Sequence, residues 1–308
     1  MLPVAQSEGP RRRKRLSPRE RTNLRNGLLF TAPGIIGLLW FFAYPILAAL
    51  FYSFTSYDGL HTLSWVGFSN YVNLAHDHLF WESLYNTAYY VVFSVPLTIL
   101  VAFLLALLLN QSWIPGLAFF RTIFFIPSIV PLISSTVLWL WIFNPQYGLI
   151  NTVLSYLNIT GPGWLNDPAW AKPALVLMGV WSVGGWMVIF LAGLQNVPAE
   201  LYEAAELDGA SASARLIFLT LPFMSPYFLF SAINNLIFGF QYFLQAFVMT
   251  QGGPAESTTF YSLYLYQNAF QYYRMGYASA MGWILFIIVA LCTFILFKSS
   301  ARRVYYGG

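Results

Sequence analysis

Few side chains in this 308-residue chain could carry chemistry, because Asp, Glu, Lys and Arg together make up only 8% of it. The three histidines lie between Asp58 and Glu82, and two of them form the triplet His76-Asp77-His78. That triplet could bind a metal ion, but its spacing is poor and nothing nearby completes a site, so we interpret it as a solvated loop. The sequence also lacks an H-E-x-x-H helix and a Walker A motif. We therefore expect no catalytic residues, no metal site and no ATP hydrolysis by this chain alone.

A second set of polar side chains interrupts a long apolar segment. Asn234, Phe238, Gln241 and Gln245 follow one another at i, i+4, i+7 and i+11, and Tyr242 lies beside them. On a continuous helix the first four would form one narrow stripe, because each residue turns by about 100°. The amides could hydrogen-bond to neighbouring helices, or the stripe could line the path of a solute. The second interpretation suits a carbohydrate, since an amide both donates and accepts and an aromatic face can cover a sugar ring.

A short acidic segment departs from its apolar surroundings. Pro198 suits the first turn of a helix, and Gly209 suits the position that ends one. Small side chains such as Ala204 and Ala205 would share one face, and three glutamates including Glu203 would form an acidic flank. The segment is either an amphipathic surface helix or a helix that docks into a groove with a basic rim.

The elements that must position these residues can be counted from the charges. Hydrophobic residues make up 58% of the chain, which excludes an ordinary soluble enzyme and a disordered chain. Six long segments contain no Asp, Glu, Lys or Arg, and a helix needs about 20 apolar residues to cross a bilayer. We expect six membrane-spanning helices at Leu28–Phe54, Tyr85–Leu109, Thr122–Phe143, Ala174–Leu194, Met224–Thr250 and Met275–Phe297. The Asn144–Gly163 segment is expected to be a loop, because it is rich in Asn, Pro and Gly.

Prolines occur inside several of the expected helices. They are Pro33, Pro45, Pro96, Pro127, Pro131 and Pro226. Membrane helices tolerate proline, because neighbouring groups satisfy the freed backbone carbonyls. The alternative interpretation is that these prolines kink the helices and so shape a cavity.

The basic residues are distributed unequally between the two sides of the expected helices. Thirteen Lys and Arg lie on one side and two on the other, and the more basic side of a membrane protein faces the cytoplasm. Both termini are then cytoplasmic. The expected organisation is a basic segment at 1–27, a six-span domain at 28–299 with a cytoplasmic loop at 196–222, and a tail at 300–308. The net charge of +4 thus reflects topology and anionic lipid, not binding to nucleic acid.

The acidic segment carries a resemblance to a known family. Glu203-Ala204-Ala205, then Gly209 after three residues, then Leu219-x-Leu221-Pro222, resembles the EAA motif of ABC-importer permeases, which usually has Ile at the position of Leu219. Five further segments resemble signatures of the carbohydrate-transporting branch, in the same order: Ser69-Asn70-Tyr71, Asn86-Thr87, Phe120-Arg121-Thr122, Thr250-x-Gly252-Gly253-Pro254 and Met275-Gly276-Tyr277-Ala278. The resemblance covers about residues 28–300 and is strongest to the larger maltose-transporter and glycerol-3-phosphate-transporter permeases.

The resemblance implies a fold and a set of partners. It implies an all-α, multi-pass protein of the bacterial or archaeal cytoplasmic membrane with the type I ABC-importer permease fold. Such a chain works with a second permease subunit, commonly a different one, with two ATPase subunits and with an external solute-binding protein. ATP and Mg²⁺ belong to the ATPases, so this chain would need no cofactor.

The resemblance also implies roles for named residues. Glu203 would be the ionic anchor in a cleft of the ATPase, Ala204 and Ala205 the close-packed face, and Gly209 the turn that ends the helix. The fifth span lines the cavity in this family, which favours the solute-path interpretation of the polar stripe. A carbohydrate is the expected solute, and another solute such as a polyol phosphate is the alternative. An enzyme or passive channel with six spans is disfavoured, because the spans contain neither a catalytic dyad nor a charged filter.

Overall fold

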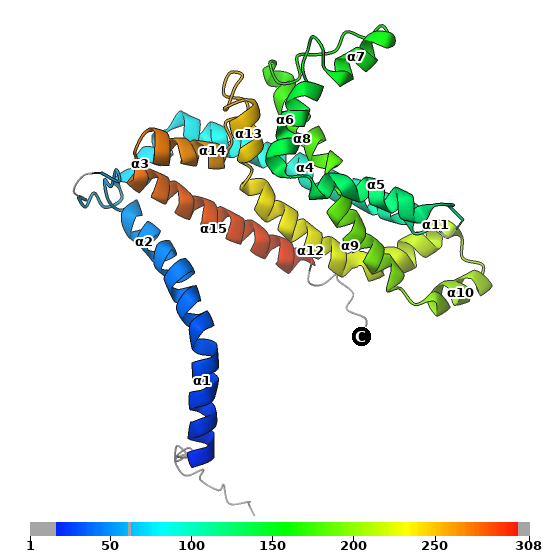
Figure 1. Ribbon diagram of the computed structural model, residues 1–308, viewed down its shortest axis with the longest axis horizontal. Helices are drawn as coiled ribbons and strands as arrows, with labels where there is room; N and C mark the ends of the chain where they lie inside the picture. Colours follow the sequence, from blue (N-terminus) through cyan, green and yellow to red (C-terminus); the bar gives the residue numbers. More distant parts are fainter. Residues whose placement is uncertain (1–16, 61–62, 112, 301–308) are drawn as a thin grey trace, which may run out of the picture. The chain divides into compact units, whose positions relative to one another are not determined.

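The structure is a computed structural model that describes residues 17–60, 63–111 and 113–300. The expectations for residues 1–16 and 301–308, which include most of the basic N-terminal segment and nearly all of the tail, lie outside the described residues. The regular elements of the described part are helices, and an isolated β-bridge joins Thr55 to Trp65 (Figure 1). The chain divides into two compact units, one ending at Phe51 and the other beginning at Tyr52.

The first unit is one long apolar helical segment. It contains α1 (Pro18–Leu38), a π-helical turn (Leu39–Ala43) and most of α2 (Tyr44–Ser53). Ser17 and Glu20 cap its start by exchanging two hydrogen bonds, Ser17 N to Glu20 Oε2 at 2.7 Å and Glu20 N to Ser17 Oγ at 3.3 Å. The first expected span is therefore a helix, but this cap starts it at Pro18 rather than at Leu28.

The second unit is built around one long helix, α4. Its helices are α3 (Ser69–His76), α4 (His78–Leu109), α5 (Leu117–Ile129), α6 (Leu132–Ile142), α7 (Leu149–Tyr156), α8 (Pro168–Trp181), α9 (Gly184–Gln195), α10 (Ala199–Leu207), α11 (Ala212–Arg215), α12 (Leu221–Phe240), α13 (Leu244–Met249), α14 (Tyr261–Tyr266) and α15 (Met275–Ser300), with π-helical turns at Leu216–Thr220 and Gln267–Gln271. α4 packs against α8, α9 and α12, and α15 packs along α12.

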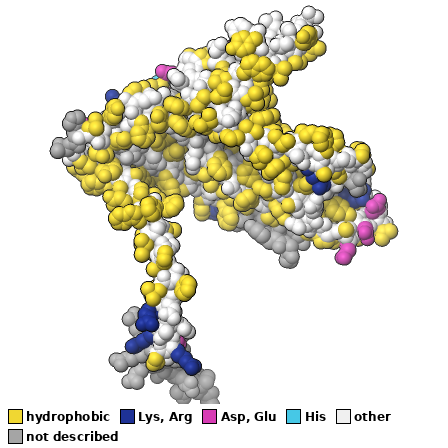
Figure 2. Space-filling model, viewed as in Figure 1, with side chains coloured by type: hydrophobic (Ala, Val, Ile, Leu, Met, Phe, Trp, Pro, Cys, Tyr) yellow, Lys and Arg dark blue, Asp and Glu magenta, His cyan; other side chains and the backbone are white. Residues whose placement is uncertain are grey.

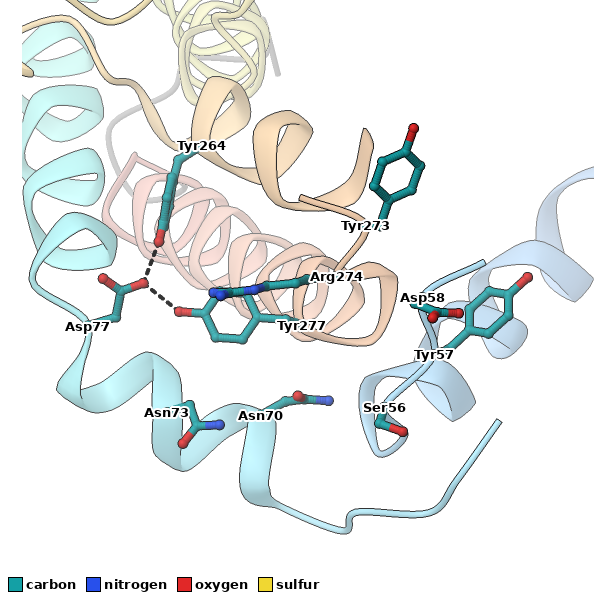
Figure 3. A pocket seen from close by; sticks show the side chains of 10 residues that line it. All are labelled: Ser56, Tyr57, Asp58, Asn70, Asn73, Asp77, Tyr264, Tyr273, Arg274 and Tyr277. Atoms are coloured by element: carbon teal, nitrogen blue, oxygen red, sulfur yellow. Dashed lines mark hydrogen bonds between the residues drawn. The ribbon is translucent and has the colours of Figure 1, made fainter. Parts of the chain in front are cut away.

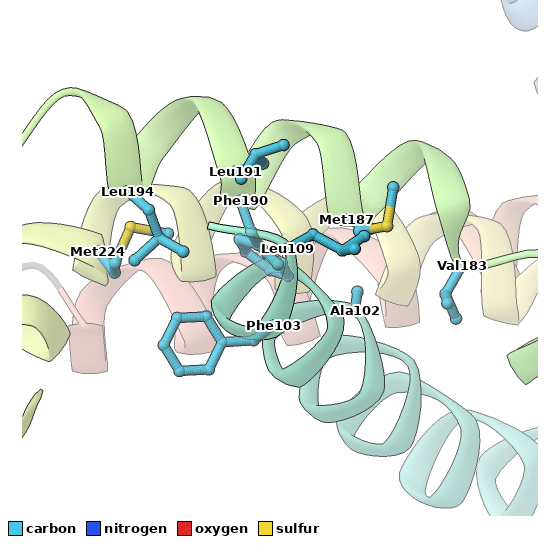
Figure 4. Packing of buried hydrophobic residues seen from close by; sticks show 10 residues of the cluster. Ala102, Phe103, Leu109, Val183, Met187, Phe190, Leu191, Leu194 and Met224 are labelled. Carbon is cyan, nitrogen blue, oxygen red and sulfur yellow. The ribbon is translucent and has the colours of Figure 1, made fainter. Parts of the chain in front are cut away.

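A buried apolar cluster holds α4, α9 and α12 together (Figure 4). The rings of Phe103 and Phe190 meet edge to face, with centroids 6.0 Å apart, and Met187 and Met224 are fully buried beside them. α5 approaches the start of α9 so closely that a Cβ on Gly184 would lie 2.2 Å from the backbone oxygen of Phe124. Only glycine fits there, so this residue sets the distance between α5 and α9.

The third and fourth expected spans are bent rather than straight. α5 and α6 meet at 99° across Val130 and Pro131, and α8 and α9 meet at 49° across Ser182 and Val183. Pro131 lacks an amide proton and favours an extended conformation for the residue before it, and Val130 is extended. Among the described residues, four apolar helical stretches are long enough to cross a membrane, one of them running through the connection between α12 and α13. The number of spans rises to as many as six if each bent pair is one span. The bend beside Pro131 fits the alternative interpretation of the prolines, in which they kink the expected helices.

Short helices occupy segments that the sequence pattern left as loops. α7 lies inside the expected Asn144–Gly163 loop, α3 lies before α4, and α14 lies before α15. Within α7 the large side chains are mostly exposed, and Tyr156 is 82% exposed. The expectation of an irregular loop at Asn144–Gly163 was therefore wrong for its central part, because eight consecutive residues from Leu149 form a helix.

Large apolar side chains cover much of the surface of the second unit (Figure 2). On α15 alone, six of them are more than half exposed: Phe286, Ile287, Leu291, Phe294, Ile295 and Phe297. A soluble monomer seldom exposes apolar patches of this extent. A group of acidic side chains lies instead at the end occupied by α10 (Figures 1 and 2). The exposed apolar surface fits contact with lipid, and α10 fits contact with water or another protein.

Candidate functional site

The polar stripe lies where one helix stops and another begins. α12 ends at Phe240 and α13 begins at Leu244, so Gln241 and Tyr242 lie in a short connection rather than in a continuous helix. The Tyr242 ring is buried against Tyr90 of α4, with ring centroids 4.0 Å apart, and meets Phe260 edge to face at 5.2 Å. These aromatic contacts fix the connection on α4.

The break opens a polar cavity of about 420 Å³ in the second unit. Four of the five residues predicted for the stripe line it: Phe238, Gln241, Tyr242 and Gln245. Asn234 does not, because its amide nitrogen donates to Phe230 O of its own helix at 2.8 Å, and the neighbouring Asn235 lines the cavity instead. The expectation of one straight stripe was therefore wrong in its geometry, although most of its members lie in one cavity.

The lining also contains hydroxyl groups on α4 that were not predicted from the sequence. Tyr90, Ser94 and Thr98 follow one another at intervals of four residues on α4, and all three line the cavity. Ser182 and Leu132 come from the bends of the fourth and third expected spans. The four-residue spacing of polar groups inside an apolar span was the signal that could have identified these residues of α4. No Lys, Arg, Asp or Glu is among the described residues that line this cavity.

The predicted acidic helix is present as α10 and ends as expected. Gly209 adopts the left-handed conformation with φ +77°. Its N–H donates to Glu206 O at 3.0 Å, and the N–H of Ala210 donates to Ala205 O at 2.9 Å. This pair of hydrogen bonds is a Schellman motif, which needs a positive φ at the residue after the cap. The sequence prediction that Gly209 ends the helix is confirmed.

Two contacts hold α10 to the segment that follows it. The hydroxyls of Tyr202 and Thr220 are 2.8 Å apart, and Arg215 Nη1 lies 3.1 Å from Glu206 Oε2. Glu203 and Ala204 are exposed, and Leu207 is 90% exposed. α10 therefore exposes a carboxylate, a small side chain and a large apolar side chain on its surface, and no described residue covers them.

A hydrogen-bond network around Asn86 and Lys172 connects α4, α8 and the segment after α13. Lys172 Nζ donates to Asn86 Oδ1 at 2.7 Å and lies 4.9 Å from the centre of the Tyr85 ring. The Asn86 amide nitrogen donates to Glu256 O at 3.0 Å and to Thr259 O at 3.2 Å. The segment around Asn86, which carried part of the resemblance, is thus hydrogen-bonded to the backbone that follows the Thr250–Pro254 segment. The sequence analysis did not assign a role to Lys172.

The arrangement of apolar helices, polar cavity and exposed acidic helix agrees with the comparison to known families. Residues 80–306 match the family of binding-protein-dependent transport system inner membrane components. The chain belongs to this family. Its members are membrane components of transport systems, so this chain is a multi-pass membrane protein of a transporter.

Relatives match the permease over nearly its full length. A probable ABC transporter permease protein, YesP of Bacillus subtilis, is 41% identical over 91% of this chain and 92% of its own. The lactose transport system permease protein LacF of Rhizobium radiobacter is 36% identical over 90% of this chain and 95% of its own. A crystal structure of a bacterial ABC transporter that imports alginate contains a chain of the same fold, with a TM-score of 0.80, 23% identity, and coverage of 92% of this chain and 99% of that one.

Proposed function

We propose that this chain is one transmembrane subunit of an ATP-driven importer for a carbohydrate, in which it forms half of the translocation pore. A second permease subunit forms the other half, two ATPase subunits bind ATP and Mg²⁺, and an external solute-binding protein delivers the solute. The chain crosses the bacterial or archaeal cytoplasmic membrane six times with both termini in the cytoplasm, so each bent helix pair counts as one span. It performs no catalysis itself.

The observation that carries the proposal is the cavity at the break between α12 and α13. Gln241 and Gln245 contribute amide donors and acceptors to its lining, and Ser94 and Thr98 of α4 contribute hydroxyls. Phe238, which is 65% exposed, supplies an aromatic face in the same cavity. A sugar complements this lining, because its hydroxyls both donate and accept hydrogen bonds and its ring has an apolar face.

The charge of the cavity discriminates between the two solutes that the sequence left open. A phosphorylated solute would need a Lys or Arg to balance its charge, since a desolvated anion without a partner is costly. The described cavity-lining residues include neither. This favours a sugar over a polyol phosphate. It agrees with the names of two relatives, the lactose transport system permease protein LacF and the trehalose/maltose transport system permease protein MalF of Thermococcus litoralis.

α10 is the proposed site of coupling to the ATPase. An exposed carboxylate at Glu203 and the small side chains of Ala204 and Ala205 suit insertion into a cleft with a basic rim. Gly209 ends the helix, and Arg215 holds it through Glu206. ATP-driven movement of the partner would then be transmitted to α12, because only the turn at residues 208–211 separates α10 from α11, which continues through a π-helical turn into α12.

Uptake by the purified complex tests the proposal. The chain is co-expressed with its second permease, ATPase and binding protein and reconstituted in liposomes. ATP-dependent uptake of labelled lactose, maltose, trehalose and glycerol 3-phosphate is then measured. We expect uptake of at least one sugar and none of the phosphate. Uptake of glycerol 3-phosphate alone, or of no solute under conditions in which ATP is hydrolysed, would refute the carbohydrate assignment.

A further inference from the structure

A second polar cavity, of about 640 Å³, lies away from the α12–α13 break (Figure 3). Its lining comes from the segment after α2, from α3, from α14 and from the start of α15. Asp58 follows the first span, Asp77 precedes the second and Arg274 precedes the sixth. In the six-span topology all three positions are external, so this cavity faces the solution outside the cell. It shares none of its described lining residues with the cavity at the break.

Asp77 is the centre of a hydrogen-bond network in the lining of this external cavity. Its Oδ2 atom accepts hydrogen bonds from the hydroxyls of Tyr264 and Tyr277, both at 2.5 Å, and its Oδ1 atom accepts the N–H of Leu79 at 3.0 Å. Figure 3 shows the two tyrosines converging on the carboxylate from α14 and α15. Because both hydroxyl protons are committed to Asp77, each phenol oxygen can only accept a hydrogen bond from a ligand and cannot donate one.

Donors without a partner face the same cavity. The structure gives the guanidinium of Arg274 no hydrogen-bond or carboxylate partner among the described residues, although its backbone N–H donates to Asn268 O at 2.8 Å. The side-chain amide of Asn73 likewise has no partner in the described chain. Asn70 is held in place, because its amide nitrogen donates to Ser53 O and Thr55 O, both at 2.9 Å. The cavity therefore combines fixed acceptors with free donors.

The charges of the lining narrow the class of ligand. Asp58 and Asp77 oppose an anion, and Arg274 opposes a cation. A neutral molecule with many hydroxyls meets neither obstacle, because each hydroxyl accepts from Arg274 or Asn73 and donates to a tyrosine, amide or carboxylate oxygen. The volume falls in the usual range for small-ligand sites, about 300–1,000 Å³.

We propose that this external cavity binds a neutral saccharide, at a site separate from the translocation path. The external location and the choice of saccharides as ligands rest on the proposed function. The assignment of the residues rests on the cavity alone: Arg274 and Asn73 donate to the sugar, and Tyr264 and Tyr277 accept from it.

Binding measured without the solute-binding protein tests this proposal. The complete complex in lipid nanodiscs is titrated with lactose, maltose and trehalose, and saturation-transfer difference NMR gives each dissociation constant. Arg274→Ala should weaken the binding of the preferred sugar by about tenfold, because a hydrogen bond from a charged donor is lost. Asn73→Ala should weaken it severalfold. Lys298→Ala, at the other end of α15, and Tyr156→Ala, on α7, are matched controls that should leave it unchanged.

The outcomes separate this proposal from the proposed function. An unchanged dissociation constant in Arg274→Ala, or no signal from any of the three sugars, overturns the external site. Arg274-dependent binding of inorganic phosphate in place of sugar overturns it as well. ATP-dependent uptake is measured on the same preparations after the solute-binding protein is added. If no uptake occurs, the proposed function is refuted. The external site is decided by the sugar titration alone. ATP hydrolysis and size-exclusion profiles show that each variant complex is assembled.

Discussion

Asn86 Oδ1 accepts a hydrogen bond from Lys172 Nζ at 2.7 Å, across 86 residues of sequence. Asn86 is fully buried, and its amide nitrogen holds two carbonyls of the segment that follows α13. Lys172 also lies 4.9 and 5.2 Å from the ring centres of Tyr85 and Tyr89, where the aromatic faces stabilise its charge. This single lysine therefore joins α8 to α4 and, through Asn86, to the connection between α13 and α14.

Removing Lys172 should destabilise the protein. Lys172→Ala leaves the Asn86 oxygen buried without a donor, which costs about 1–3 kcal/mol. Asn86→Ala should cost more, because it also leaves the carbonyls of Glu256 and Thr259 unpaired. Thermal unfolding of the purified complex measures both. Lys298→Ala, which removes a charge from an exposed site, is the control, and a Lys172→Ala protein as stable as this control would contradict the role of the network.

Asp77 should make stability depend on pH in the acidic range. Burial raises the pKa of Asp77, but hydrogen bonds from Tyr264, Tyr277 and backbone amides outweigh it and hold this pKa below its ordinary value. The carboxylate therefore stabilises the folded state above the ordinary aspartate pKa of about 3.9, and this contribution is lost as the pH falls through the lower folded value. The same contacts, with burial as the larger cause, raise the pKa of Tyr264 to about 12.

Asp77→Asn tests this pH dependence. The variant should unfold at a lower temperature than the wild type at pH 7, and the difference should shrink as the pH is lowered below about 4. Asp58→Asn provides a control at a second carboxylate of the same cavity. A difference that stays constant across this pH range would show that the ionised form of Asp77 contributes nothing.

The sequence was informative where a local signal decides the structure. Gly209 was predicted to end α10, and it does so with φ +77°, because a helix stop depends on the conformation of one residue. Pro131 carried a local signal as well, but proline marks a break without giving its angle, and the 99° bend depends on how α6 packs.

The break at Gln241 and Tyr242 had no such signal in the residues themselves. It depends on the packing of the Tyr242 ring against Tyr90, which lies far away in the sequence, and against Phe260. A helical projection assumes a continuous helix, so it selected most of the cavity residues but placed Asn234 among them. The cavity-lining residues of α4 were missed because a helical projection treats one helix at a time, whereas several helices form the cavity.

Topology can be tested by labelling single cysteines. The native Cys292 is first replaced by Ser, and Tyr156→Cys on α7 and Glu200→Cys on α10 are then made separately, since both positions are exposed. A membrane-impermeant maleimide should label position 156 in intact cells and position 200 only after permeabilisation. Labelling of position 156 from the cytoplasmic side alone would reverse the proposed orientation.

Coupling through α10 predicts a loss of transport without a loss of membrane insertion. Glu203→Lys should weaken binding of the ATPase, because removing one partner of a charge-assisted contact at a buried interface costs roughly 2–5 kcal/mol. Gly209→Val should act through the backbone, since a β-branched residue is strained at φ +77°. Co-purification of the ATPase and ATP-dependent uptake are measured together. Glu200→Lys is a matched control on the same helix, and it should have a smaller effect. Full uptake by both variants would refute the coupling role of α10.

The solute path is tested at the two glutamines of the α12–α13 break. Gln241 is exposed and Gln245 half-buried in the same cavity, and neither makes a side-chain hydrogen bond within the described chain. Their amides are therefore available to a solute, whereas the Asn234 amide nitrogen already donates to Phe230 O.

Gln241→Ala and Gln245→Ala should each lower sugar uptake by about fivefold to tenfold, the equivalent of one hydrogen bond of roughly 1 kcal/mol or slightly more. They should also change the preference between lactose and maltose, while basal ATP hydrolysis persists. Asn234→Ala should leave this preference unchanged, because that residue lies outside the cavity. The contradicting outcome is that the two glutamine variants assemble poorly, while the complexes that do assemble transport sugar normally. The amides would then hold helices together, and the solute path would lie elsewhere.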